Sequence, residues 1–500
     1  MSTSTADINR NKLFWGSCLA LLTTAFAFTV ITAIAFSVKQ EFNVTNAQLG
    51  LFTGVFFIGF TVSQVLFAPF CDTIGMRWIV RLAFVGHVVG ALLLLFAGSF
   101  GMAVTGSLFA GLGAGLVEAG CNPLVAALYP DDKSAKLNMF HMWFPYGNLI
   151  AALLTTFVIS AFVGDGEWRG YTALILVPAA AYGIMMLFSE YPQTEGASAG
   201  VSFAESFKAS FLTPIMWIML PMMLLTASME LPPSSWVPSV LQSGGVDGIL
   251  VFGFVFGIMG TLRLVAGPIL KALTPTGVLL GSSILGTIGL YLFSQAETVG
   301  MYFLTAAIWA AGIALFWPTM LGYVSERNPK SGALGLGAMG AVGMLASFLV
   351  TPLLGDIADQ EGHTKIGATE AMAVFESVEN DWPAIAANAG ILKEDIEGVI
   401  ASVSEVTAEY ASSGSLPAGV TAQALRAVST ADVDSPIKAE ASAILNPADN
   451  YGGKTSFAKL APFGIILIIV FGYLYAQDRR SGGYKAEKLV ATDEKEGAAA

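Results

Sequence analysis

The carboxyl group of Glu118 lies within an otherwise apolar, glycine-rich run, Gly111–Pro123. Asn122 follows four residues later, so on a helix the two polar side chains share one face. An ionised carboxyl in the middle of a membrane helix costs on the order of 2.5–3.5 kcal/mol on insertion scales, so it is expected to face a partner or a water-filled cavity. We therefore predict that Glu118 and Asn122 line a binding or proton-transfer site. A structural glutamate, hydrogen-bonded to a neighbouring helix, is the alternative.

A second acidic side chain, Glu230, is also surrounded by apolar residues. Pro232 and Pro233 follow it two and three residues later, and this pattern predicts a helix broken beside Glu230. A broken membrane helix is tolerated where protein or a cavity satisfies its free backbone groups, so Glu230 and Trp236 are candidate cavity residues. The alternative for Trp236 is a place in the aromatic belt at the membrane interface.

The elements that must position these groups are membrane helices. The chain has 500 residues, of which 55% are hydrophobic and only 12% charged, whereas a soluble domain carries about 25% charged residues. Lipid is the natural solvent for such a surface, and only helices keep their backbone satisfied there in a chain of this pattern. We predict twelve spans, near 13–38, 49–70, 79–98, 101–128, 137–163, 171–189, 213–240, 248–270, 277–295, 300–325, 332–354 and 457–476.

The distribution of Lys and Arg residues along the chain predicts its orientation in the membrane. Most of the 24 Lys and Arg residues fall on the side that holds both termini, and they include Arg263, which is predicted to begin a cytoplasmic turn at the end of the eighth span. The positive-inside rule then places both termini in the cytoplasm, for a protein of the cell inner membrane. The net charge of −12 is concentrated in residues 356–456, and no basic face for nucleic acid is expected.

The expected fold is an all-α membrane protein with two six-helix bundles. Residues 1–190 form the first bundle, 191–210 a cytoplasmic middle loop and 211–355 helices 7–11 of the second bundle. An acidic external insert, 356–456, precedes helix 12 at 457–476. The insert is predicted to be helical, with disorder as the alternative. The cytoplasmic tail, 477–500, is expected to be disordered from shortly after Tyr475.

The turn after the second span reads Ala68-Pro69-Phe70-Cys71-Asp72-Thr73-Ile74-Gly75-Met76-Arg77. It resembles the signature of the major facilitator superfamily, although Ala68 stands where Gly is usual and Thr73 where a basic residue is usual. The resemblance implies a gating role for Asp72, Gly75 and Arg77. The alternative is an ordinary charged turn.

Residues 111–150 are similar to the fucose permease-like sugar:proton symporters of this superfamily. The similarity consists of the glycine-rich helix with Glu118 before Cys121-Asn122-Pro123, and of the segment from Lys136 through Asn138 to His141. It implies that Glu118 binds proton and substrate and that His141 contacts sugar, and it adds Asn138 to the candidates. The carboxylate that fucose permease carries on its first helix is missing here.

These features predict a secondary active transporter, most simply one that takes up a monosaccharide or similar small polar solute with protons by alternating access. No enzymatic activity is expected, because no nucleophile–base pair, metal-ligand cluster or phosphate loop occurs in the sequence. The protein is also expected to be a monomer and to need no cofactor. The sequence leaves open whether the coupling ion is a proton or sodium. Two other functions remain as alternatives, namely efflux of amphipathic compounds and a membrane sensor that binds its ligand through the insert.

Overall fold

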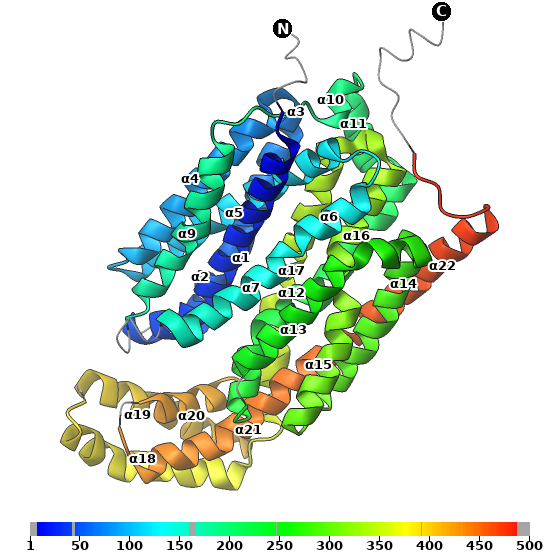
Figure 1. Ribbon diagram of the computed structural model, residues 1–500. Helices are drawn as coiled ribbons and strands as arrows, with labels where there is room; N and C mark the ends of the chain where they lie inside the picture. The colour runs from blue at the N-terminus through cyan, green and yellow to red at the C-terminus, as the bar shows by residue number, and fades with distance from the viewer. Residues whose placement is uncertain are drawn as a thin grey trace, which may run out of the picture.

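The computed structural model describes residues 8–42, 46–159, 167–246, 248–391, 393–431 and 433–487, and within these ranges the chain forms helices and no strands. Long helices run side by side through the molecule (Figure 1). Ten of the described helices are long and apolar enough to cross a membrane, and α13 is a shorter apolar helix. The predicted all-helical, multi-pass architecture is confirmed at this level, because each predicted span overlaps a helix over its described residues.

The first half of the chain packs through close helix contacts. A Cβ atom added to Gly86 of α4 would lie 2.8 Å from the Cα of Gly113 in α5, so small residues let these two backbones touch. The predicted fifth span is divided between three elements, and its last residues, 160–163, lie outside the described ranges. The elements of this half are α1 (Arg10–Glu41), α2 (Asn46–Phe67), η2 (Ala68–Phe70), α3 (Cys71–Ile74), α4 (Met76–Leu95), α5 (Phe100–Leu128), α6 (Lys133–His141), α7 (Trp143–Leu153), the π-helical turn η3 (Leu154–Ile159) and α9 (Arg169–Met186).

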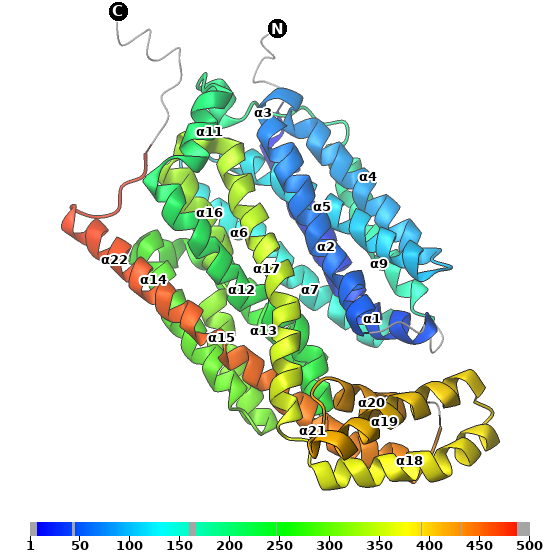
Figure 2. The same ribbon diagram turned by 180° about the vertical axis from the view of Figure 1, so that it is seen from behind.

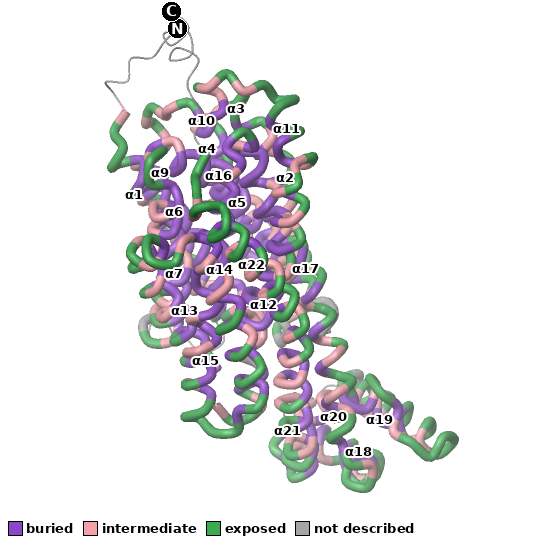
Figure 3. The backbone as a smooth tube through the Cα atoms, turned by 90° about the vertical axis from the view of Figure 1, so that its right-hand side faces the viewer, coloured by how far each residue is buried: buried purple, intermediate pink, exposed green. Residues whose placement is uncertain are grey.

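Two short helices, α10 (Glu195–Ser198) and α11 (Phe203–Phe211), connect the halves at one end of the molecule (Figure 2). Buried stretches lie on the inward faces of the long helices (Figure 3), while apolar side chains such as Trp217 and Ile184 are exposed on the outside, as lipid contact requires. The second half contains α12 (Pro214–Ser243), α13 (Gly248–Leu264), α14 (Ala266–Ser294), α15 (Val299–Ile313), α16 (Phe316–Arg327), η4 (Pro329–Ser331), α17 (Gly332–His363) and α22 (Ala461–Arg480).

Residues between α17 and α22 form a helical unit at the end opposite α10 and α11 (Figure 1). It has its own core, in which Phe375, Trp382 and Leu425 are buried. Hydrogen bonds fasten it to the second half, from Asn450 Nδ2 to the Val240 carbonyl at 2.8 Å and from Lys454 Nζ to the Ala296 carbonyl at 2.9 Å. Its helices are α18 (Ala368–Asn388), α19 (Lys393–Ser413), α20 (Val420–Thr430) and α21 (Pro436–Ala458).

The prediction of a break beside Glu230 is wrong, because α12 is continuous through Pro221, Pro232, Pro233 and Pro238. A proline at position i leaves the carbonyl of residue i−4 without its helical donor. For Pro233 that carbonyl belongs to Met229, and the indole Nε1–H of Trp309 donates to it at 3.2 Å. A neighbouring helix thus replaces the lost bond, and the helix continues.

The expectation for the C-terminal tail is also wrong in part. Helix α22 extends to Arg480, and three hydrogen bonds hold residues 484–487. Tyr484 Oη donates to Glu326 Oε2 at 2.6 Å, the Glu487 amide donates to the Glu326 carbonyl at 2.7 Å, and Arg327 donates to the Lys485 carbonyl at 3.1 Å. The rest of the predicted tail, 488–500, lies outside the described residues.

Candidate functional site

Glu118, Asn122 and His141 form a buried hydrogen-bonded chain between α5 and the end of α6. Asn122 Nδ2 donates to Glu118 Oε2 at 2.5 Å, and His141 Nε2 lies 2.9 Å from Asn122 Oδ1. Because an amide oxygen only accepts, His141 Nε2 carries the hydrogen of this bond. His141 Nδ1 is 3.8 Å from Glu118 Oε1. The carboxylate therefore has protein partners, and it is only 4% exposed.

Arg263 of α13 joins this chain to the second half of the protein. Its guanidinium donates to the His141 carbonyl at 3.0 Å, to Glu230 Oε1 at 3.3 Å and to the Ala314 carbonyl at 2.6 Å. Arg263 is 2% exposed, so its predicted place in a cytoplasmic turn is wrong. The signal was present in the sequence, since Arg263 falls inside the apolar stretch 248–270, where a basic residue is expensive unless it is paired.

We call Glu118, Asn122, His141, Arg263 and Glu230 the central cluster. The charged side chains of this cluster do not balance one another. Arg263 attracts both Glu118 and Glu230, and Glu230 Oε2 has no hydrogen-bond partner. Two ionised carboxylates facing one guanidinium leave one surplus negative charge, which is costly away from water. One proton bound to a carboxyl group or to His141 would make the closed cluster neutral. The indole of Trp317 also lies near the Glu118 carboxyl group.

The remaining binding candidates lie further along their helices. Asn138 is fully buried one turn before His141, and its Nδ2 donates to the Ser134 carbonyl at 2.9 Å, while its Oδ1 has no partner. Trp236 lies about 9 Å further along α12 than Glu230, by helical rise. Its ring packs beside Gly355 of α17, where an added Cβ would come within 3.2 Å of it.

The three gating candidates lie in a turn that contacts the middle loop. Asp72 accepts a hydrogen bond from Thr194, and Arg77 Nη1 lies 3.2 Å from Glu190 Oε1. Gly75 has a φ of +86°, a value that residues with a side chain rarely adopt. The turn and the loop are thus fastened together at the end of the first half.

At the same end, α6 and α16 close the two halves against each other. Both the hydroxyl and the backbone amide of Ser134 donate to Glu326 Oε1. Gly322 makes this approach possible, because an added Cβ would lie 2.3 Å from Ser134 Oγ. Since Glu326 also accepts from Tyr484, one carboxylate connects both halves and the C-terminal segment.

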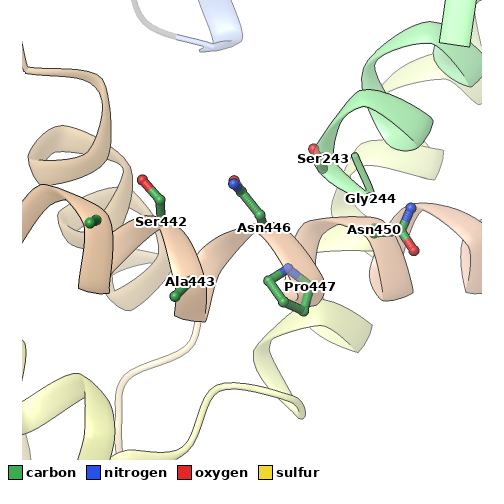
Figure 4. Close-up of a pocket in the computed structure, with 8 residues that line it drawn as sticks. Ser243, Gly244, Ser442, Ala443, Asn446, Pro447 and Asn450 are labelled. Carbon is green, nitrogen blue, oxygen red and sulfur yellow. The ribbon is translucent and has the colours of Figure 1, made fainter. Parts of the chain in front are cut away.

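A separate hollow of about 480 Å³ lies at the base of the helical unit between α17 and α22, lined by Ser243, Asn446 and Asn450 among others (Figure 4). Ser243 is thirteen residues beyond Glu230 on α12, which corresponds to about 20 Å of helix. This hollow is therefore distinct from the central cluster.

Comparison of the sequence with known families identifies the family. Residues 17–351 match the model of the Major Facilitator Superfamily, and the chain belongs to this family of transporters.

Two named relatives are similar over most of their length. The chain is 21% identical over 361 residues to a putative tartrate transporter of Agrobacterium vitis, covering 66% of this chain and 79% of that protein. It is 24% identical over 367 residues to a putative niacin/nicotinamide transporter of Bacillus subtilis (strain 168), covering 70% and 89%.

Solved structures share the fold. A proton:xylose symporter superposes with a TM-score of 0.58 at 16% identity, covering 68% of this chain and 87% of that one. The E. coli fucose:proton symporter superposes with a TM-score of 0.57 at 14% identity, covering 70% of this chain and 92% of that one. A bacterial homologue of the human lysosomal transporter Spinster superposes with a TM-score of 0.61 at 16% identity, covering 95% of this chain and 98% of that one. At these identities the likeness concerns the fold alone.

Proposed function

We propose that this protein is a proton-coupled importer of a monosaccharide or similar small polar solute in the cell inner membrane. It would have twelve spans, with both termini in the cytoplasm and residues 356–456 outside. Two bundles, residues 1–190 and 211–355 with 457–476, would rock about the central cluster, linked by the loop 191–210. The carrier would work as a monomer.

The observation that carries this proposal is the charge imbalance of the cluster. Glu118 and Glu230 face a single guanidinium, Arg263, in a site from which water is excluded. Closure of the two halves is favourable when the cluster is neutral, and therefore when it holds one proton, on a carboxyl group or on His141. Proton binding would thus control the transition between outward and inward states, which is the requirement for coupling.

Polar groups of the cluster also suit a hydroxylated solute. Asn122 and His141 can each donate and accept hydrogen bonds, and Trp317 adds an aromatic face, against which the C–H side of a sugar packs well. The xylose and fucose symporters with the same fold support this solute class.

The test is uptake of D-xylose and L-fucose by proteoliposomes, with and without an imposed pH gradient. We expect Glu118→Gln to abolish accumulation against a gradient while counterflow exchange continues. Glu297→Gln, which neutralises an exposed carboxylate before α15, serves as the control and should accumulate normally. Accumulation by Glu118→Gln would exclude Glu118 as the coupling site, and replacement of the pH gradient by a sodium gradient tests the other ion.

A second candidate solute is a small carboxylate anion. Arg263 places a buried guanidinium in the cluster, and guanidinium groups bind carboxylates well. The relatives named for tartrate and niacin transport agree with this solute class. Inhibition of sugar uptake by tartrate or nicotinate, or proton-driven uptake of these acids in place of sugar, would favour it.

A further inference from the structure

We propose that Gln64 of α2 contributes an amide to the solute-binding site, as a hydrogen-bonding group for solute hydroxyls. This inference rests on the proposed function and extends the site to a helix outside the central cluster. Gln64 is 1% exposed, and neither its Nε2 nor its Oε1 has a hydrogen-bond partner. A buried amide with both ends unpartnered costs free energy, so a ligand or another conformational state is expected to satisfy it.

Gln64 lies at the same level of the membrane as Glu118. Helices α2 and α5 run in parallel, and an added Cβ on Gly115 would lie 2.1 Å from Ser63 Oγ. Seven residues further along the chain, at the start of α3, Cys71 Sγ donates to the Ala119 carbonyl at 3.7 Å. Gln64 is therefore level with the stretch of α5 that carries Glu118.

The Gln64 amide points across the interface between the two halves. An added Cβ on Gly340 of α17 would lie 2.5 Å from both Nε2 and Oε1 of Gln64. One turn away on the same face, a Cβ on Gly343 would lie 2.6 Å from the ring of Trp317. The indole of Trp317 in turn lies near the Glu118 carboxyl group. The unpartnered amide and the indole thus occupy neighbouring hollows on one glycine face of α17.

This placement gives the amide a role in transport. Separation of α17 from α2, as the halves rock apart, would expose Gln64 to water beside Glu118. An amide offers two donors and an acceptor, which matches the donor–acceptor pair of adjacent sugar hydroxyls. The same amide held in a dry interface would have no such role and would only reduce stability.

The accessibility of an introduced cysteine to a thiol reagent tests whether position 64 becomes exposed to water. This test does not require the solute to be known. Gln64→Cys is compared with His87→Cys in right-side-out and inverted membrane vesicles, with the cationic thiol reagent MTSET as probe and the native chain as baseline. His87 is an equally buried polar residue, but it contacts Tyr182 and Gly113 within the first half. We expect the cysteine at 64 to react at least about tenfold faster than the one at 87 from one side, since a thiol must meet water to react. Equal, slow labelling at both positions from both sides would overturn the proposal.

Transport kinetics test the binding role. Gln64→Leu should raise the KM for D-xylose or L-fucose about tenfold, the factor for one lost hydrogen bond, with thermal stability equal or higher because the unpartnered amide is gone. Gln64→Asn, which keeps the amide, should recover part of the affinity. An unchanged KM in Gln64→Leu would show that the residue does not bind solute, whereas absence of sugar uptake by the wild type would refute the proposed solute class itself.

Discussion

Arg263 on α13 and Glu230 on α12 form an ion pair with 3.3 Å between guanidinium nitrogen and carboxylate oxygen, and both side chains are almost completely buried. The same guanidinium donates to the His141 carbonyl in the first half. One arginine therefore pairs with Glu230 in the second half and contacts the first half. The stability of the closed state and the movement of the proton are expected to depend on it.

Removal of one partner of this pair should destabilise the protein more than removal of both. Breaking a buried pair costs about 3–5 kcal/mol, whereas replacing both partners by apolar residues is often neutral. We therefore expect Arg263→Leu or Glu230→Leu to lower the thermal unfolding midpoint in detergent, and the double variant to recover most of the loss. Additive effects in this double-mutant cycle would contradict a direct pairing.

Loss of the Glu326 carboxylate should open the end of the molecule where α6 meets α16. Glu326 accepts from Ser134 across the halves and from Tyr484, and bonds to a charged group contribute about 1.5–3 kcal/mol each. We expect Glu326→Ala to increase labelling, from that side, of a cysteine that replaces Ser325, a buried residue next to Glu326 on α16. Asp132→Ala removes an exposed carboxylate at the same end and should leave the labelling unchanged.

The ion pair between Glu41 and Arg169 should give a pH-dependent stability at the other end of the first half. Hydrogen bonding to Arg169 lowers the pKa of Glu41, and Trp168 Nε1 also donates to it, at 2.6 Å. A lowered pKa contributes stability above the unfolded value of about 4.3, and that stability is lost as the pH falls through the folded pKa. The contribution is about 1 kcal/mol or less, because Glu41 is partly exposed.

Thermal unfolding of wild type and Glu41→Gln between pH 7 and pH 3 measures this effect. We expect the wild type to be more stable at pH 7 and the two curves to converge toward the acid end. A difference that persists unchanged at pH 3 would mean that the carboxylate charge is not its source.

Replacement of residues 365–434 by a flexible linker should leave transport intact. Helices α18–α20 share with α21 a core that is separate from the cores of the membrane helices. The hydrogen bonds that fasten the unit to α12 and to the end of α14 come from Asn450 and Lys454 on α21, which the replacement keeps. We expect proton-driven sugar uptake to continue at a comparable rate. Intact uptake would count against a sensor whose ligand binds through this unit, and loss of uptake with normal membrane insertion would instead make the unit part of the transport cycle.

The sequence by itself determined the helices and one face of the site. Helices follow from hydropathy because a backbone in lipid must satisfy its hydrogen bonds within its own segment, and Glu118 and Asn122 face the same way because helical geometry fixes residues four apart. The tertiary structure alone decided the partners that come from other helices. Arg263 is 33 residues from Glu230 and 122 from His141 in the chain, and no local rule relates positions so distant. For the same reason, only the packing showed that Trp309 supports the proline-rich α12 and that the amide of Gln64 meets the glycine face of α17.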